Sequence, residues 1–119
     1  MLTKLIAALH EQPAVPAAPE ITIEEYLRLP PGTRVQVIDV REPEEWALGR
    51  MPESVLIPMD DLAARMRELD PAQPVVTVCR SGRRSLISAA QLLAAGFSDV
   101  KSLAGGMIAW VEAGQPVER

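Results

Sequence analysis

The only cysteine of the chain, Cys79, is followed by residues that could activate a thiol. Arg80, Arg83 and Arg84 lie within five residues of it, and Gly82 lies between them. The thiolate is the nucleophilic form of cysteine, and arginine side chains and a helix N-terminus both favour that form. The alternative is a buried structural cysteine, since free cysteine is among the most buried residue types. Such a thiol gains nothing from three arginines and a glycine, so the pattern predicts a reactive cysteine.

The backbone after Cys79 is expected to form an anion-binding bowl. Gly82 allows a tight bend and leaves the peptide N–H groups uncovered. The helix that follows directs its free N–H groups and the positive end of its dipole toward the same loop. Ser81 and Ser85 add hydroxyl donors, and a helix cap is the alternative role for Ser85.

Two kinds of chemistry use such a bowl. In cysteine-dependent phosphatases, five residues separate the cysteine from an arginine that grips the phosphate bidentately. That spacing from Cys79 falls on Ser85, and Arg84 comes one residue too early. A shorter loop makes a bowl that is too small for a tetrahedral phosphate and fits one added sulfur atom. The spacing therefore favours sulfur transfer, and a phosphatase or arsenate reductase is the least favoured enzyme class.

The elements that position this loop alternate between strands and helices. Apolar runs predict strands at 34–40, 54–58, 74–78 and 99–103. Helices are predicted from a capping box at Thr22 and Glu25 to Leu29, and then at 43–49, from Asp60 or Asp61 to Leu69, at 84–95 and at 105–114. This order predicts an α/β domain with a mostly parallel central sheet. Ligands bind such sheets beyond the carboxyl ends of the strands, which is where Cys79 stands.

Composition narrows the possible functions further. The chain has 119 residues, enough for one domain, with a net charge of −4 and a pI near 5.0. This acidity argues against a nucleic-acid partner. A lone cysteine excludes an internal disulfide and a multi-cysteine metal site, and it suits a reducing compartment, so we expect a cytoplasmic protein. His10 is the only histidine and lies outside the main domain, which argues against a Cys-His pair. No apolar run reaches the ~20 residues of a membrane helix.

The N-terminal part, residues 1–19, is expected to differ from the domain at 20–119. Apolar residues at helical spacing predict an amphipathic helix at 3–11. Prolines at every third position, from Pro13 to Pro19, then predict an extended linker. The helix could pair two chains, so both a monomer and a homodimer remain open.

Four segments in order give the chain a resemblance to the rhodanese family: "VIDVREPEEWALGRMPESVLIP", "VVTVCRSGRRS", "AAGFSDVKSLAGGMIAW" and "AGQPV". The resemblance covers residues 35–117 and implies a rhodanese-like α/β fold with five strands. It implies a sulfurtransferase in which Cys79 takes a sulfane sulfur, as from thiosulfate, and carries it as a persulfide. Cyanide or a thiol then removes the sulfur, and a sulfur-relay protein is a further partner. Neither a cofactor nor a metal is implied.

The resemblance also assigns roles to single residues. Cys79 is the persulfide carrier, and the substrate-binding loop consists of Arg80, Ser81, Gly82, Arg83, Arg84 and Ser85. Ser81 is neutral where some thiosulfate-specific members have a basic residue, which leaves the preferred donor open. The alternatives to an enzyme are a persulfide carrier with weak turnover and a non-catalytic interaction module of the same fold, although such modules usually lack the cysteine.

Outside the loop, the "DVRE" stretch at 39–42 is expected to be structural. Arg41 is expected to pair with Asp39 or Glu44 and to pin loops near the site. Trp46 and Trp110 are expected to pack in the core or at its rim, and Gly105 and Gly106 to form a tight turn. Relatives commonly have "GHIPGA" where this chain has "GRMPES", so Arg50 replaces a histidine and Glu53 a glycine.

Overall fold

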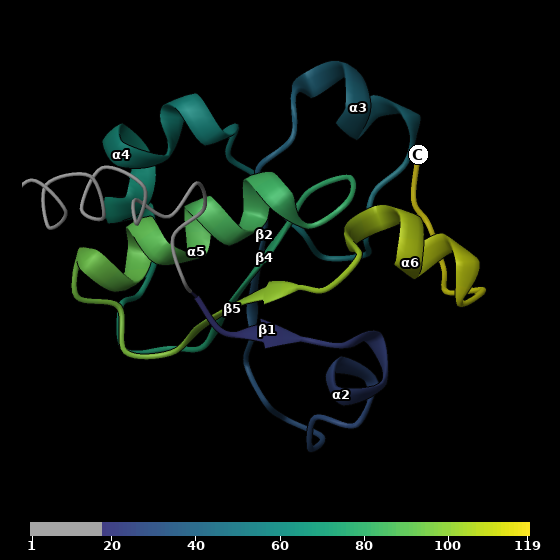
Figure 1. The fold of residues 1–119 in the computed structure, drawn as a ribbon, viewed down its shortest axis with the longest axis horizontal. Helices are drawn as coiled ribbons and strands as arrows, with labels where there is room; N and C mark the ends of the chain where they lie inside the picture. Colours follow the sequence, from purple (N-terminus) through teal and green to yellow (C-terminus); the bar gives the residue numbers. More distant parts are fainter. Residues whose placement is uncertain (1–17) are drawn as a thin grey trace, which may run out of the picture.

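The computed structural model describes residues 18–119, in which strands and helices alternate (Figure 1). The strands are β1 (Glu20–Ile21), β2 (Gln36–Asp39), β3 (Val55–Leu56), β4 (Val75–Val78) and β5 (Val100–Leu103). The helices are α2 (Ile23–Leu27), α3 (Pro43–Leu48), α4 (Leu62–Arg65), α5 (Arg83–Ala94) and α6 (Gly106–Glu112). The helix predicted at 3–11 and most of the proline linker lie outside the described residues. Among residues 18–119, no helix has the length and apolar character that crossing a bilayer requires.

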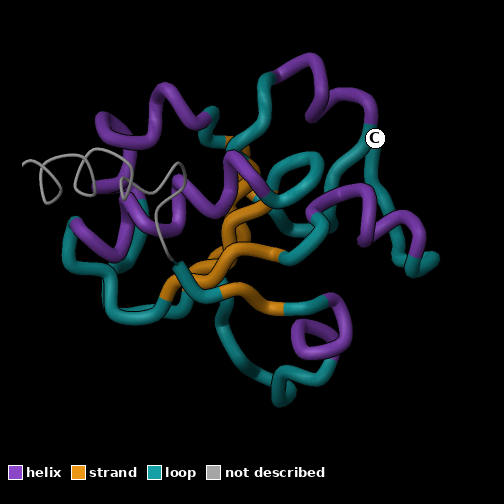
Figure 2. Tube along the Cα trace, viewed as in Figure 1, coloured by secondary structure: helices purple, strands orange, loops and turns teal. Residues whose placement is uncertain are grey.

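The five strands form one sheet in the order β1-β5-β4-β2-β3, and every pairing is parallel. Figure 2 shows the strands at the centre of the molecule, with helices around them. This confirms the predicted α/β fold with a five-stranded sheet. Strand β4 lies in the middle, and all four of its residues are buried. A strand covered on both faces needs apolar side chains on both, and three of its four residues are valine. The hydroxyl of the fourth, Thr77, is buried and donates to the Ser85 carbonyl at 2.7 Å. The residue pattern did not predict β1, whose two residues pair with Ser102 and Leu103.

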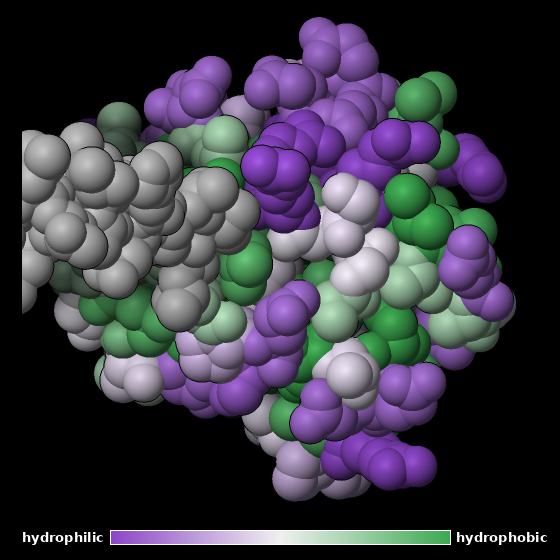
Figure 3. Space-filling model, viewed as in Figure 1, coloured by the Kyte–Doolittle hydropathy of each residue, from purple (hydrophilic) through white to green (hydrophobic). Residues whose placement is uncertain are grey.

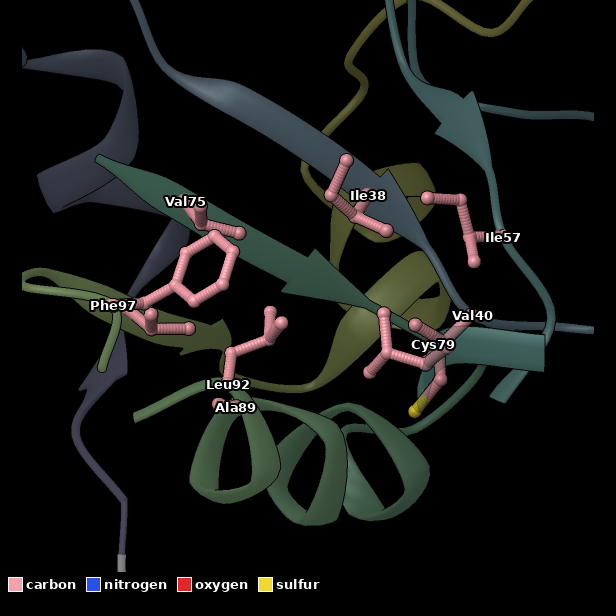
Figure 4. Close-up of a cluster of buried hydrophobic side chains, with 10 residues drawn as sticks. Ile38, Val40, Ile57, Val75, Cys79, Ala89, Leu92 and Phe97 are labelled. Atoms are coloured by element: carbon pink, nitrogen blue, oxygen red, sulfur yellow. The ribbon is translucent and has the colours of Figure 1, made fainter. Parts of the chain in front are cut away.

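Alternation along β4 decides which way the cysteine points. Val76 and Val78 face the cluster of buried side chains that includes Met107 and Trp110 of α6. Val75 and Cys79 belong to the opposite cluster, with Leu92 of α5 (Figure 4). Side chains two residues apart in a strand share a face. The period of the strand therefore places the thiol against α5.

The predicted element boundaries are largely confirmed. Thr22 and Glu25 form the reciprocal capping box at the start of α2. The prediction of one regular helix after Asp60 or Asp61 was wrong, because this segment consists of a 3-10 turn, the four-residue α4 and a second 3-10 turn. Asp61 makes no side-chain cap. The apolar residues of this segment still face the core, since Leu62 is buried and Met66 and Leu69 pack against the same cluster.

A buried ion pair fixes the connection between β2 and α3. The Arg41 guanidinium donates to both carboxylate oxygens of Asp39, with Nη2 to Oδ2 at 2.8 Å, and both residues are buried. The same guanidinium donates to the backbone carbonyls of Glu45 and Gly49, at 3.2 and 2.7 Å. The predicted pairing of Arg41 with Asp39 is confirmed, and its alternative partner Glu44 is not used. Arg41 thereby ties the last turns of α3 to the carboxyl end of β2.

We expect Arg41→Ala to lower the free energy of unfolding by about 3–5 kcal/mol, because it leaves the buried Asp39 carboxylate without its partner. Urea unfolding followed by tryptophan fluorescence measures this change. Arg65→Ala is the matched control, since it removes an arginine from the exposed pair with Glu68 and should change stability little. Equal effects of the two substitutions would contradict the structural role of Arg41.

Candidate functional site

Cys79 directly follows β4 at the carboxyl edge of the sheet, where the chain turns into α5. Its side chain is only 1% exposed. The sulfur accepts a hydrogen bond from the amide N–H of Gly82 at 3.1 Å. Gly82 has a φ of +103°, a conformation that favours glycine. The loop therefore closes tightly around the sulfur, and a glycine is needed to close it.

Two buried serine hydroxyls lie behind the sulfur. Cys79 Sγ and Ser85 Oγ are 3.3 Å apart, and Ser85 Oγ lies 2.7 Å from the hydroxyl of Ser102 on β5. Both serines are fully buried. The cap position of α5 is occupied by Gly82, so the Ser85 hydroxyl faces the sulfur and does not cap the helix. The hydroxyl of Ser85 thus gives the sulfur a buried polar neighbour.

The first turn of α5 provides further N–H groups at the loop. The first helical backbone bond runs from Leu86 N to the Gly82 carbonyl. The amides of Arg83, Arg84 and Ser85 precede it and therefore have no acceptor within the helix. Unpaired amides at a helix N-terminus carry partial positive charge and attract anions. The loop and the helix together can stabilise negative charge on a sulfur atom.

Helix α6 holds the carbonyl side of the same loop. The amides of Met107 and Ile108 donate to the carbonyl oxygens of Cys79 and Arg80, at 2.9 and 3.1 Å. Gly106 makes this approach possible, because a Cβ at that position would collide with the Cys79 carbonyl oxygen and lie 2.7 Å from that of Arg80. Gly105 and Gly106 both have positive φ, which confirms the predicted tight turn. The carbonyls of Cys79 and Arg80 are thus both held by α6.

The three arginines of the loop have different surroundings. Arg84 binds both carboxylate oxygens of Glu45 on α3, at 2.6 and 2.8 Å. These hydrogen bonds lower the pKa of the Glu45 carboxyl from 4.5 to about 2 and raise the pKa of Arg84 above its usual value. Arg80 and Arg83 are exposed, and neither forms an ion pair within the described part of the chain. Only these two present unmatched positive charge at the loop.

Two of the six predicted loop residues, Gly82 and Ser85, contact the sulfur. Arg84 binds Glu45. The other three, Arg80, Ser81 and Arg83, are exposed. Sequence reasoning missed Ser102 and Glu45. A serine inside the apolar strand run at 99–103 is a detectable signal for a buried polar contact. Glu45 gives no comparable signal, because it lies 39 residues from Arg84. No cluster of metal-ligating side chains occurs between residues 18 and 119.

In the segment "GRMPES" at 49–54, the residue that stands in place of a glycine keeps a glycine-like backbone conformation. Glu53 has a φ of +64° and is the one non-glycine residue with positive φ in the described range. Arg50 lies over the ring of Trp46, 4.8 Å from its centroid. Trp46 is half-buried and Trp110 is buried, so both tryptophans pack as predicted.

We expect Glu45→Gln to destabilise the protein in a pH-dependent way. The pKa of Glu45 in the fold, about 2, lies below the 4.5 of an unpaired carboxyl. Its ion pair therefore stabilises the fold fully above about pH 4.5, and this stabilisation is lost as the pH falls toward 2. Urea midpoints of wild type and variant should differ at pH 6 and converge near pH 2. Glu44→Gln, which removes an adjacent acid that forms no ion pair in the structure, is the control. A difference that stays constant with pH would contradict this role.

We expect Gly106→Ala to displace α6 from the cysteine loop. The substitution combines backbone strain of about 1–3 kcal/mol with a collision against the Cys79 carbonyl. Unfolding should become easier, and the rate of Cys79 alkylation by iodoacetamide should change. Gly114→Ala is the matched control, because Gly114 has a similar φ of +72° but no atom within 4 Å of the added Cβ. If both variants alkylate at the same rate, the contact with α6 does not set the reactivity of the cysteine.

Comparison with known proteins identifies the family of the chain. A family model described as a rhodanese-like domain matches residues 22–113. A sulfurtransferase from Allochromatium vinosum is 40% identical over 83 residues, covering 70% of this chain and 78% of that protein. Thiosulfate sulfurtransferase GlpE from Pseudomonas syringae is 38% identical over 93 residues, covering 72% and 88%. The crystal structure of a rhodanese-like domain protein from Staphylococcus aureus matches with a TM-score of 0.72 and 35% identity, covering 78% and 91%. The chain therefore belongs to the rhodanese-like domain family.

Proposed function

We propose that this protein is a sulfurtransferase, which moves a sulfane sulfur from a donor such as thiosulfate to cyanide or a thiol through a persulfide on Cys79. The observation that carries the proposal is the position of Cys79 Sγ. It accepts a hydrogen bond from the Gly82 amide and lies at the start of α5, where the first-turn amides have no acceptor within the helix. Relatives named as a sulfurtransferase and as a thiosulfate sulfurtransferase support it. The lone thiol fits a reducing compartment, and we include a cytoplasmic location in the proposal.

The reaction has two displacement steps. The Cys79 thiolate attacks the outer sulfur of thiosulfate, the S–S bond of the donor breaks, and sulfite leaves with the bonding electron pair. Cyanide or a thiolate then attacks the terminal sulfur of the persulfide, and the Cys79 thiolate leaves. The described part of the chain contains no second cysteine, so the acceptor comes from outside the protein.

The loop residues have two kinds of role: some stabilise or attract negative charge, and others hold the loop in position. The N–H groups from Gly82 to Ser85 stabilise the terminal sulfur anion, and the Ser85 hydroxyl contacts Cys79 Sγ from behind. Arg80 and Arg83 attract anionic donors, an effect that added salt should weaken. Arg84 is a positioning residue, because its charge is matched by Glu45. Ser81 lines the rim.

Intact mass after brief exposure to thiosulfate tests the proposal. Wild-type protein should gain the mass of one sulfur atom, cyanide should remove it with release of thiocyanate, and Cys79→Ser should gain nothing. Ser88→Ala, which removes a buried hydroxyl that has no hydrogen-bond partner, should behave as wild type. If the mass increases only with 3-mercaptopyruvate or with a persulfidated protein, that compound and not thiosulfate is the donor. No gain from any of the three donors would overturn the enzyme and favour the interaction module.

A further inference from the structure

A groove of about 560 Å³ borders the cysteine loop between α3 and α6. Its apolar wall consists of Leu48 at the end of α3, Met107, Ile108 and Val111 on α6, and Val117 in the tail. Arg80, the residue after Cys79, lies at one side of it. Figure 3 shows hydrophobic side chains gathered over α6 and beside the end of α3. We call this surface the α3–α6 groove.

The groove concentrates exposed apolar surface. Five large hydrophobic side chains are exposed within residues 18–119, and three of them line this groove: Leu48 at 77%, Ile108 at 41% and Val111 at 56%. Contiguous apolar surface next to a functional site marks a binding region. Thiosulfate and cyanide are small hydrophilic anions and gain nothing from an apolar wall. The wall therefore fits a larger ligand that has apolar groups of its own.

The groove is preformed by the C-terminal tail. Arg50 and Glu118 exchange both backbone hydrogen bonds, at 3.0 and 2.9 Å, and Arg119 Nε donates to the Leu48 carbonyl at 3.1 Å. The tail packs so closely against Gly49 that a Cβ there would lie 2.7 Å from Val117. A ligand that enters a preformed site loses less free energy to ordering of the protein. The groove is thus ready to bind without rearrangement of its walls.

Charges at the rim specify the ligand further. Arg80 and Arg119 line the groove, and neither forms an ion pair with any described residue. Glu45 also lines it, but its carboxylate is bound by Arg84, which leaves Glu112 as the unpaired acid. Complementary charge steers association and fixes the orientation of a bound partner. The part of the groove around Arg80, the residue next to Cys79, therefore favours an acidic group.

We propose that the α3–α6 groove docks a segment of a partner protein that carries apolar side chains, an acidic residue and the thiol that accepts sulfur from Cys79. This inference rests on the proposed sulfurtransferase activity and names its acceptor. The partner's thiolate attacks the terminal sulfur of the Cys79 persulfide. The persulfide S–S bond breaks, the Cys79 thiolate leaves with the electron pair, and the partner becomes the persulfide. No oxidant or reductant is required.

Transfer to synthetic peptide thiols tests the acceptor. The full chain is loaded with thiosulfate, and transfer is measured to cyanide and to peptides of equal length that contain Leu-Cys-Leu-Asp, Ser-Cys-Ser-Asp or Leu-Cys-Leu-Asn. The apolar acidic peptide should react about tenfold faster than the serine peptide, because only its leucines can bury apolar surface against the groove. It should also react faster than the asparagine peptide, by a margin that shrinks with salt. Equal rates for all three peptides would overturn the proposal.

Two double variants locate the effect on the protein. Leu48→Ser with Val111→Ser should lower the ratio of the peptide rate to the cyanide rate about tenfold. Leu27→Ser with Val55→Ser removes two hydrophobic side chains of similar exposure, 50% and 48%, that do not line the groove. This control should leave the ratio unchanged. An unchanged ratio in the groove variant, or an equal fall in the control, would overturn the proposal.

Binding without sulfur chemistry separates this inference from the proposed function. A peptide with Leu-Ser-Leu-Asp has no thiol, and its binding to the unloaded protein is followed through backbone amide chemical shifts. Saturable shifts confined to α6, the end of α3 and the tail would support docking even if Cys79 took no sulfur from any donor. Absence of such shifts would overturn docking even if Cys79 formed a persulfide with thiosulfate.

Discussion

Two hydrogen bonds between α6 and the cysteine loop set the geometry on which the site depends. The amides of Met107 and Ile108 donate to the carbonyls of Cys79 and Arg80. The amide of Gly82, in the same loop, donates to the sulfur. The contact needs Gly106, because a side chain there would meet those carbonyls. It also joins the ends of two neighbouring strands, β4 and β5, through the turns that follow them. The sulfur of Cys79 is therefore positioned by backbone groups, which cannot rotate away as side chains can.

Ion pairs divide the arginines of this region between structure and chemistry. Arg41 forms an ion pair with buried Asp39, and Arg84 forms one with Glu45. Both pairs act on α3, one from β2 and the other from α5, so this six-residue helix is held mainly by charge, since none of its residues is buried. The remaining loop arginines are exposed and available to anions. An anion at the loop thus meets cations that have no competing carboxylate.

Much of the fold could be predicted from the sequence because its strands and helices follow strong local patterns. The apolar run 74–78, the capping box at Thr22 and the glycines at 105 and 106 all behave as expected. Strand β1 could not be predicted, because two residues carry no period. The division of the segment after Asp60 into short turns follows from packing that local sequence does not encode. Within the site, the loop and its cysteine were predictable, but the partners from distant elements, Glu45 and Ser102, were not.

The two edges of the sheet are formed by its shortest strands, β1 and β3, with two residues each. A strand that short offers few unpaired backbone groups, so another chain finds little to extend by edge-to-edge pairing. The longer strands, of four residues each, lie inside the sheet, where each pairs with a neighbour on both sides. The helices can thus expose an apolar groove while the sheet remains a poor template for aggregation.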